Sequence, residues 1–116
     1  MPNNFKRKLQ RDIGTSLTQV GSYAVGSNTE VTVIGLDIAN TSSSQVLVDA
    51  TLNDGSNDTY LIKEAPIPSG GSLVVIGGDQ KVVLEPTDSI KVKSDTASSV
   101  DVVMSAAGRL PKTNGL

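Results

Sequence analysis

The sequence contains no histidine, no cysteine and no tryptophan, and only three of its 116 residues are aromatic: Phe5, Tyr23 and Tyr60. Serine–histidine and cysteine–histidine catalysis, zinc binding through imidazole or thiolate groups, and disulfide bonding all require the missing residues. We therefore expect that the protein is not an enzyme and that it binds no cofactor and no metal. The absence of thiols leaves the redox compartment undetermined.

Long apolar runs are absent as well. The longest, residues 73–76, is much shorter than the roughly 20 residues that a membrane-spanning helix needs. The basic residues near the N-terminus are not followed by the apolar segment of a secretory signal peptide. We expect a soluble, unprocessed chain.

β-Branched side chains are abundant, since Val, Ile and Thr together account for 31 residues. Ser and Thr together make 24 residues, and Gly adds 11. This composition is typical of short strands joined by polar turns and argues against a helical bundle. The length fits a single domain.

From Thr18 onward, apolar and polar residues alternate with a period of two, and turn residues interrupt the pattern at short intervals. The pattern predicts strands at residues 18–25, 30–40, 45–52, 60–63, 73–76, 80–84, 89–94 and around 100–104. The Asp-Gly step in segment 53–58 predicts a hairpin. A change of phase beside Gly35 predicts a bulge at which the strand changes sheets, and the Pro- and Gly-rich segment 65–71 predicts a crossover.

These strands predict an all-β fold. We expect an immunoglobulin-like or jelly-roll-like antiparallel β-sandwich of about seven to eight strands, with an extended or short-helical N-terminal arm. The predicted core is aliphatic and almost free of aromatic rings, so the isolated domain should be marginally stable. Association with further copies would add stability, which favours a homo-oligomer.

Charge is distributed unevenly along the chain. Between Asp12 and Gly108 there are 12 acidic and 4 basic residues, whereas the two ends carry 6 basic residues and no acid. This predicts a basic N-terminal arm (1–16), a β-sandwich domain (17–107) and a polar C-terminal tail (108–116). A basic arm on an acidic body is typical of an arm that docks on a neighbouring subunit. The alternatives are a solvated, frayed terminus and a nucleic-acid-binding arm, for which four charges and one Phe are a weak basis.

The arm also carries an apolar pattern. Phe5, Leu9 and Ile13 are spaced at i, i+4 and i+8, which would place them on one side of a short helix. Such a helix is too short to be stable alone and would need a groove on its own body or on a partner. We predict that the arm binds a partner through apolar anchors and the basic residues around them: Phe5, Lys6, Arg7, Lys8, Leu9, Arg11 and Ile13.

Three other groups of residues could form a binding or catalytic site, but each also has a plain structural explanation. The acidic loop 53–58 could supply oxygen ligands to calcium, but it lacks the twelve-residue loop pattern and its trailing Glu, so we favour a plain turn. The scattered carboxylates could form a glycosidase-like acid pair, but most of them occupy turns or outward strand positions. A glycan-binding module would normally stack aromatic rings on the sugar, and the body offers only Tyr23 and Tyr60.

Several short sequence segments, each typical of a strand or a turn, are spread over the chain. They are Asn4-Phe5-Lys6-Arg7, Ile13-Gly14-Thr15, Val31-Thr32-Val33-Ile34-Gly35-Leu36, Ala39-Asn40-Thr41, Val48-Asp49-Ala50-Thr51-Leu52, Asp88-Ser89-Ile90-Lys91-Val92 and Val100-Asp101-Val102-Val103-Met104-Ser105. Together they resemble small virion structural proteins of tailed bacteriophages, especially of cyanophages. The resemblance covers most of the chain from Asn4 to Ser105 and includes no catalytic signature.

The resemblance implies a non-enzymatic sandwich subunit that is built in repeated copies into the virion, assembled in the cytoplasm of a bacterial host. We expect other virion proteins and copies of the chain itself as partners, with no specific nucleic acid and no membrane. The preferred hypothesis is a subunit of the neck or tail (head–tail) apparatus that docks through its basic arm. The alternatives are a capsid cement or decoration protein at inter-capsomer contacts and a host-surface glycan-binding module.

Overall fold

A computed structural model describes residues 3–27 and 29–109. Within these ranges the chain forms nine strands and one short 3-10 helix, η1, and no helix there is long and apolar enough to cross a membrane. The elements are β1 (Asn3–Ile13), β2 (Thr18–Gln19), η1 (Val20–Ser22), β3 (Glu30–Asn40), β4 (Val46–Asn53), β5 (Asp58–Ile67), β6 (Ser72–Ile76), β7 (Val82–Leu84), β8 (Ser89–Ser94) and β9 (Val100–Arg109). The predicted all-β sandwich is confirmed, with one strand more than expected.

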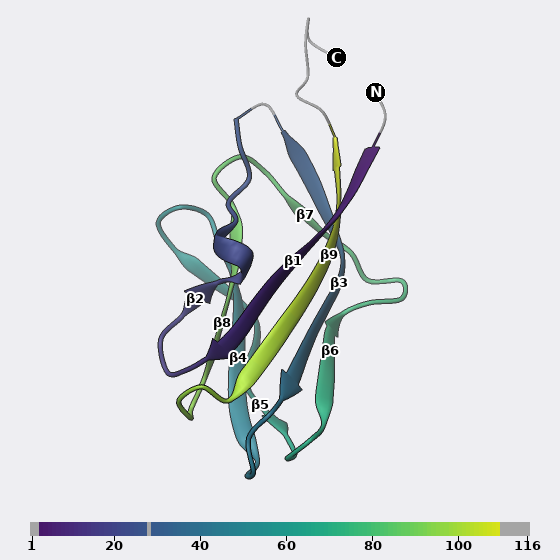
Figure 1. The fold of residues 1–116 in the computed structure, drawn as a ribbon. Coiled ribbons are helices and arrows are strands. Elements are labelled where there is room, and N and C mark those ends of the chain that lie inside the picture. The colour runs from purple at the N-terminus through teal and green to yellow at the C-terminus, as the bar shows by residue number, and fades with distance from the viewer. Residues whose placement is uncertain (1–2, 28, 110–116) are drawn as a thin grey trace, which may run out of the picture.

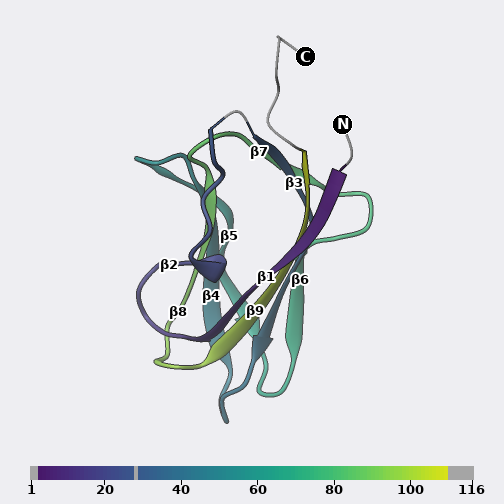
Figure 2. The same ribbon diagram turned by 45° about the horizontal axis from the view of Figure 1, so that its top comes forward.

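The strands form two antiparallel sheets. Sheet A has the order β1-β9-β3-β6, with β7 also paired to β3, and sheet B has the order β2-β8-β4-β5. The two sheets are separate layers, and β1 and β9 run side by side along one edge (Figures 1 and 2). The predicted hairpin between β4 and β5 is confirmed by their pairing from Val46↔Ile67 to Asn53↔Asp58.

The predicted bulge beside Gly35 is present, but it has a different consequence. The register between β3 and β9 shifts between Val33 and Gly35. β3 does not change sheets there; instead its other neighbour changes, from β7 before the bulge to β6 after it. Val33 and Leu36 are both fully buried, although strict alternation would place them on opposite faces of the strand. The bulge between them shifts the alternation by one residue, so that both side chains face the core.

The helical alternative for the N-terminal segment is wrong, because residues 3–13 form the extended strand β1. β1 pairs with β9 from Asn3↔Arg109 to Ile13↔Val100, so ladder hydrogen bonds replace those of a helix. At the other end, β9 continues through Gly108 to Arg109. Residues 110–116 of the predicted tail lie outside the described residues.

Two other segments differ from their predictions. The strand expected at 18–25 stops after Gln19, because Gly21 and Ser22 adopt positive φ angles of 64° and 51° and turn the chain into η1. The predicted crossover at 65–71 begins later, since β5 continues to Ile67. Pro66 is tolerated because β5 is an edge strand, where a missing backbone donor leaves no ladder bond unmade.

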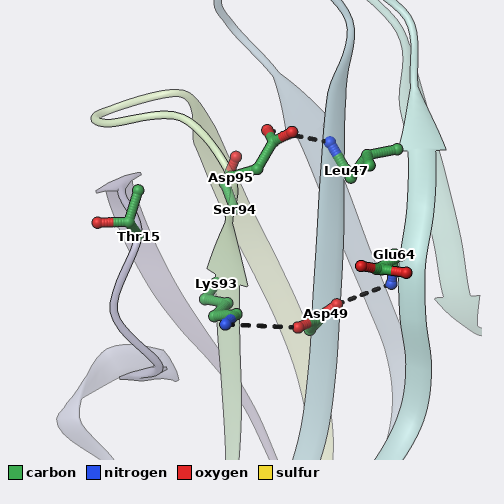
Figure 3. A pocket seen from close by; sticks show the side chains of 7 residues that line it. All are labelled: Thr15, Leu47, Asp49, Glu64, Lys93, Ser94 and Asp95. Atoms are coloured by element: carbon green, nitrogen blue, oxygen red, sulfur yellow. Dashed lines mark hydrogen bonds and ion pairs between the residues drawn. The ribbon is translucent and has the colours of Figure 1, made fainter.

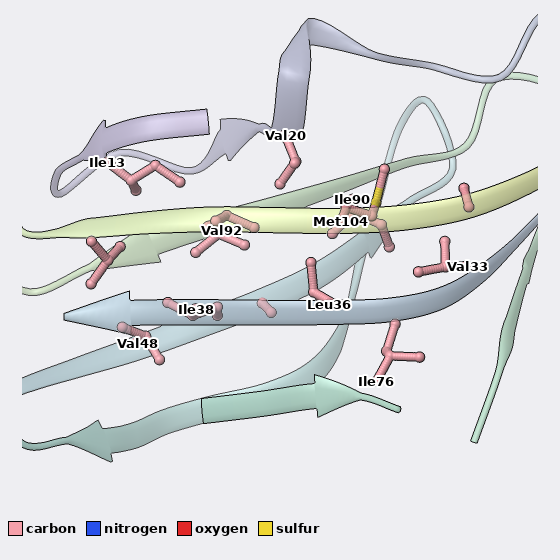
Figure 4. Close-up of a cluster of buried hydrophobic side chains, with 14 of the residues drawn as sticks. Ile13, Val20, Val33, Leu36, Ile38, Val48, Ile76, Ile90, Val92 and Met104 are labelled. Atoms are coloured by element: carbon pink, nitrogen blue, oxygen red, sulfur yellow. The ribbon is translucent and has the colours of Figure 1, made fainter. Parts of the chain in front are cut away.

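The core between the sheets is aliphatic, and no aromatic side chain of the described residues is fully buried in it (Figure 4). Its buried members are Ile13, Val20, Val25, Val31, Val33, Leu36, Ile38, Val46, Val48, Ala50, Ile67, Ile76, Leu84, Ile90, Val92, Val100, Val102, Met104 and Ala106. Tyr23 packs against the edge of this cluster and is only partly buried. Core positions alternate with less buried ones along most of β3 and β9, as a two-layer sandwich requires.

One buried polar side chain links the two sheets. Asn40, at the end of β3, donates from Nδ2 to the carbonyl oxygen of Ile67 at the end of β5 (2.9 Å) and to that of Ser44 (2.8 Å). Its Oδ1 accepts hydrogen bonds from the backbone N–H and the hydroxyl of Ser42. All the hydrogen-bonding capacity of this amide is thus used at the point where the sheets meet.

Candidate functional site

The predicted docking segment lies on β1, an edge strand of sheet A whose one neighbour in the sheet is β9. Side chains alternate along a strand, so odd and even positions face opposite sides. Phe5, Arg7 and Leu9 lie on the outer face of the sheet, and the side chains of Phe5 and Leu9 are 75% and 49% exposed. Lys8 faces η1, where its Nζ lies 4.5 Å from the centre of the Tyr23 ring.

Ile13 is separated from the other two apolar residues of the predicted stripe. Asp12 adopts a φ of 56°, and the pairing of β1 with β9 shifts register between Gln10 and Ile13. The N–H of Asp12 donates to Oδ1 of Asp101 (3.0 Å), which holds this bulge in place. Ile13 turns into the core and is 2% exposed, so Phe5 and Leu9 are the exposed apolar residues of the segment.

The basic residues of β1 are available to a partner. Lys6, Arg7 and Arg11 are exposed, and none of them forms an ion pair with a carboxylate of the described residues. Lys8 is half-buried against Tyr23, and burial raises the pKa of the Tyr23 hydroxyl above its ordinary value. β1 thus presents three unpaired cations at the edge of an acidic body.

The outer face of sheet A carries exposed apolar side chains on β1 and on three further strands, with polar residues between them. The register places Leu9 beside Val103 of β9, Val103 beside Asp37 of β3, and Asp37 beside Val74 of β6. A second row, closer to the start of β1, runs Phe5, Ala107, Thr32 and Val83 in the same order of strands. Five exposed side chains define what we call the apolar face of sheet A: Phe5, Leu9, Val74, Val83 and Val103.

Sheet B has a polar outer face instead. Asp49 of β4 is 6% exposed; its Oδ2 lies 3.8 Å from Nζ of Lys93 on β8, and its Oδ1 accepts a hydrogen bond from the N–H of Glu64 (2.7 Å) (Figure 3). Asp95, at the rim of this hollow, accepts from the N–H of Leu47 (3.2 Å). The carboxylates of Asp49 and Asp95 therefore each hold neighbouring strands together. No group of three acidic side chains in the described residues is arranged to hold a metal ion.

The loop at 53–58 is the turn that the sequence favours over a calcium site. One oxygen of Asp54 accepts hydrogen bonds from the N–H groups of Asn57 (2.8 Å) and Ser56 (2.9 Å). These bonds, with that from Asn57 the larger cause, hold the pKa of Asp54 below its usual value. Gly55 supplies the positive φ of 102° that the turn requires.

Each of the two tyrosine rings has one face covered by a lysine side chain. Lys8 lies over the ring of Tyr23, and Nζ of Lys63 lies 5.2 Å from the ring centre of Tyr60. Tyr60 belongs to sheet B, whereas Tyr23 follows η1 and contacts β1. They therefore form no common stacking platform, and no observation favours the glycan-binding alternative.

The sequence prediction missed three residues of the apolar face: Val74, Val83 and Val103. Each has a second valine beside it in the chain, at Val75, Val82 and Val102. Adjacent residues of a strand point to opposite faces, so a valine doublet must present one side chain outward. Such doublets in three strands are the signal that could have identified this face.

Comparison with known proteins identifies the fold but not a family. The sequence matches no known protein family and no curated protein. These comparisons therefore give no support to the predicted resemblance to cyanophage proteins. Among solved structures, the chain is similar to one in the acidic stable capsid structure of Helicobacter pylori bacteriophage KHP30, with a TM-score of 0.54 and 10% identity over 95% of this chain and 89% of that chain.

A chain from the disulfide-linked pili that form Bacillus endospore appendages is also similar, with a TM-score of 0.49 and 11% identity over 96% of this chain and 88% of that chain. At such identities a structural likeness shows the arrangement of strands alone. The chain is thus an all-β sandwich whose fold is shared with a chain of a phage capsid.

Proposed function

We propose that the protein is a non-enzymatic structural subunit of a bacteriophage virion, present in repeated copies that contact one another and other virion proteins. The observation that carries the proposal is the apolar face of sheet A, bordered by the basic strand β1. Apolar side chains exposed on four strands of one sheet are typical of a surface that another protein covers. The likeness of the fold to a phage capsid chain supports the same role.

The contacts of the polar residues also favour a structural role. Asp49 and Asp95 are engaged in hydrogen bonds or an ion pair that hold strands together, and Asp54 organises a turn. A catalytic acid or base needs a group that is positioned toward a substrate instead of being used within the fold. These three carboxylates therefore serve the fold, which favours docking over catalysis as the role of the surface.

Within the virion, the sequence hypothesis is a subunit of the neck or tail apparatus, where copies of the sandwich would form a ring around the axis. The alternative, a cement or decoration protein on the capsid, is favoured by the likeness to a capsid chain. In both placements Lys6 and Arg11 would approach an acidic surface of a neighbouring virion protein, since neither has an acidic partner among the described residues of its own chain.

The test uses charge reversal rather than deletion of β1, because removing β1 would expose the edge of β9. The double variant Lys6→Glu/Arg11→Glu keeps the strand and should reduce incorporation into particles. Lys63→Glu reverses an exposed cation on β5 of sheet B, away from β1 and sheet A, and is the control. Circular dichroism checks that both variants fold. Normal incorporation of the double variant would contradict docking through the basic strand.

A further inference from the structure

We infer that the apolar face of sheet A is an interface between two copies of this chain, related by a two-fold axis that runs roughly along the strands. In this arrangement β1 of each copy lies over β6 and β7 of the other. The inference deepens the proposed function, because it names the occupant of the docking surface. It concerns the purified chain, so it can fail or succeed independently of the virion.

The first support is the composition of the face. Five large apolar side chains are exposed on it, from 45% for Val103 to 75% for Phe5, and they come from four strands of one sheet. The sixth exposed large apolar residue in the described chain, Tyr60, lies on sheet B. Two sheets that pack face to face bury such rows against each other at a spacing of about 10 Å.

Charge selects the orientation of the second copy. If the two-fold axis crossed the strands, β1 would lie on β1 of the other copy and bring Arg7 and Arg11 of both copies into one contact. Edge-to-edge pairing of the two β1 strands would align the same like charges. β6 and β7 contain no charged residue, so an axis along the strands places the basic strand over an uncharged part of the face.

The same orientation brings opposite charges together. The row Leu9, Val103, Asp37, Val74 meets the same row in reverse order, so Leu9 of one copy faces Val74 of the other. Asp37 of the second copy then lies one strand and one row from Arg7. With strands about 4.8 Å apart and two residues spanning about 6.8 Å, this is a displacement of about 8 Å within the plane, which an arginine side chain can reach. The symmetry forms this pair twice.

The size of the face sets the strength of the contact. Four strands about 4.8 Å apart, over about 20 Å of their length, cover roughly 400 Å² in projection on each copy. The two copies together would bury roughly 800 Å², which is below the roughly 1,000 Å² of stable interfaces and in the range of weak, transient ones. We therefore expect association that depends on protein concentration and is strengthened when many copies are held together in an assembly.

Cysteine crosslinking tests the interface directly, because the natural chain contains no cysteine. Leu9→Cys combined with Val74→Cys should give a crosslinked dimer with a short bis-maleimide, since each new thiol would face its counterpart on the other copy across the spacing of about 10 Å between packed sheets. Within one copy the two positions are three strand spacings apart, about 14 Å, which is beyond the reach of so short a reagent. Neither single variant should crosslink. A crosslink through Leu9→Cys alone would place β1 on β1 and overturn the proposed arrangement.

Sedimentation velocity of the full chain over a concentration series supplies the second readout. Val74→Lys, which faces Leu9 between Arg7 and Arg11 of the other copy, should weaken dimerisation by about tenfold or more, whereas Tyr60→Lys, on sheet B, should leave it unchanged. Arg7→Glu and Asp37→Arg should each weaken it, and the two together should restore it. A chain that is monomeric at every concentration, or a dimer insensitive to Val74→Lys, would overturn the inference. Incorporation of such a monomeric chain into particles would leave the proposed function standing.

Discussion

The side chain of Asn40 should be the most important polar group for the stability of the sandwich. It joins the end of β3 in sheet A to the end of β5 in sheet B through the bond from Nδ2 to the carbonyl oxygen of Ile67. The substitution Asn40→Ala removes this bond and the three others that the amide makes to Ser42 and Ser44. The backbone bonds of Asn40 to Gly70 and Gly71 remain.

The expected loss follows from the burial of each partner. Ile67 is 1% exposed, so water does not replace the hydrogen bond that its carbonyl oxygen loses, and this loss costs about 1–1.5 kcal/mol. Ser42 and Ser44 lie in a loop where water can replace the lost bonds, so each of the other three bonds contributes only about 0.5 kcal/mol. We expect the free energy of unfolding to fall by about 3 kcal/mol, and the melting temperature to fall by roughly 10 °C or more.

Urea unfolding, followed by far-ultraviolet circular dichroism, measures this loss. The matched control is Ser43→Ala in the same loop, because Ser43 is exposed and its side chain makes no hydrogen bond within the described residues. The control should change stability by less than about 0.5 kcal/mol. If Asn40→Ala were no more destabilising than the control, the side-chain link between the sheets would not contribute to the stability of the fold.

Three further predictions concern acid, alkali and the core. Because the pKa of Asp54 is lowered in the folded state, its contribution to stability is present above the ordinary pKa range of aspartate and is lost as the pH falls through the folded pKa. Asp54→Asn should therefore flatten the acid limb of a stability–pH curve measured by thermal melting. The raised pKa of Tyr23 has the opposite sense, with stability complete below pH 10.0 and lost as the pH rises through the folded pKa, so Tyr23→Phe should be less sensitive to alkali. Leu36→Ala, at a fully buried site, should cost about 2–5 kcal/mol in urea unfolding, whereas Val103→Ala, on the exposed face, should cost less than about 1 kcal/mol; equal losses would contradict the assigned core.

Period-two patterns predicted the body of the fold well where side chains alternate between core and solvent. The predicted bounds of β3 and β8 agree with the structure because both strands have paired neighbours on each side and uninterrupted alternation apart from the bulge in β3. β2 was predicted too long because its end depends on backbone angles at Gly21 and Ser22. A non-glycine residue at positive φ, such as Ser22, leaves no clear sign in the sequence.

The N-terminal segment shows why a spacing of four residues is ambiguous. Phe5 and Leu9 share a face in a helix, but they also share a face in a strand, since four is a multiple of two. The partner strand β9, almost a hundred residues away in the chain, decides between the two. Ile13 was placed with them because the bulge at Asp12 could not be foreseen. The docking residues are thus predictable as a segment, and the face they share with Val103 is not.

The most direct test of the proposed virion role is the number of copies of this protein in purified particles, determined by quantitative mass spectrometry against the major capsid protein. We predict a reproducible, stoichiometric value. About 6 or 12 copies would match a ring in the neck or tail, and on the order of hundreds would match a decoration protein on the capsid. Absence from the purified particle would contradict a structural role in the virion in either placement.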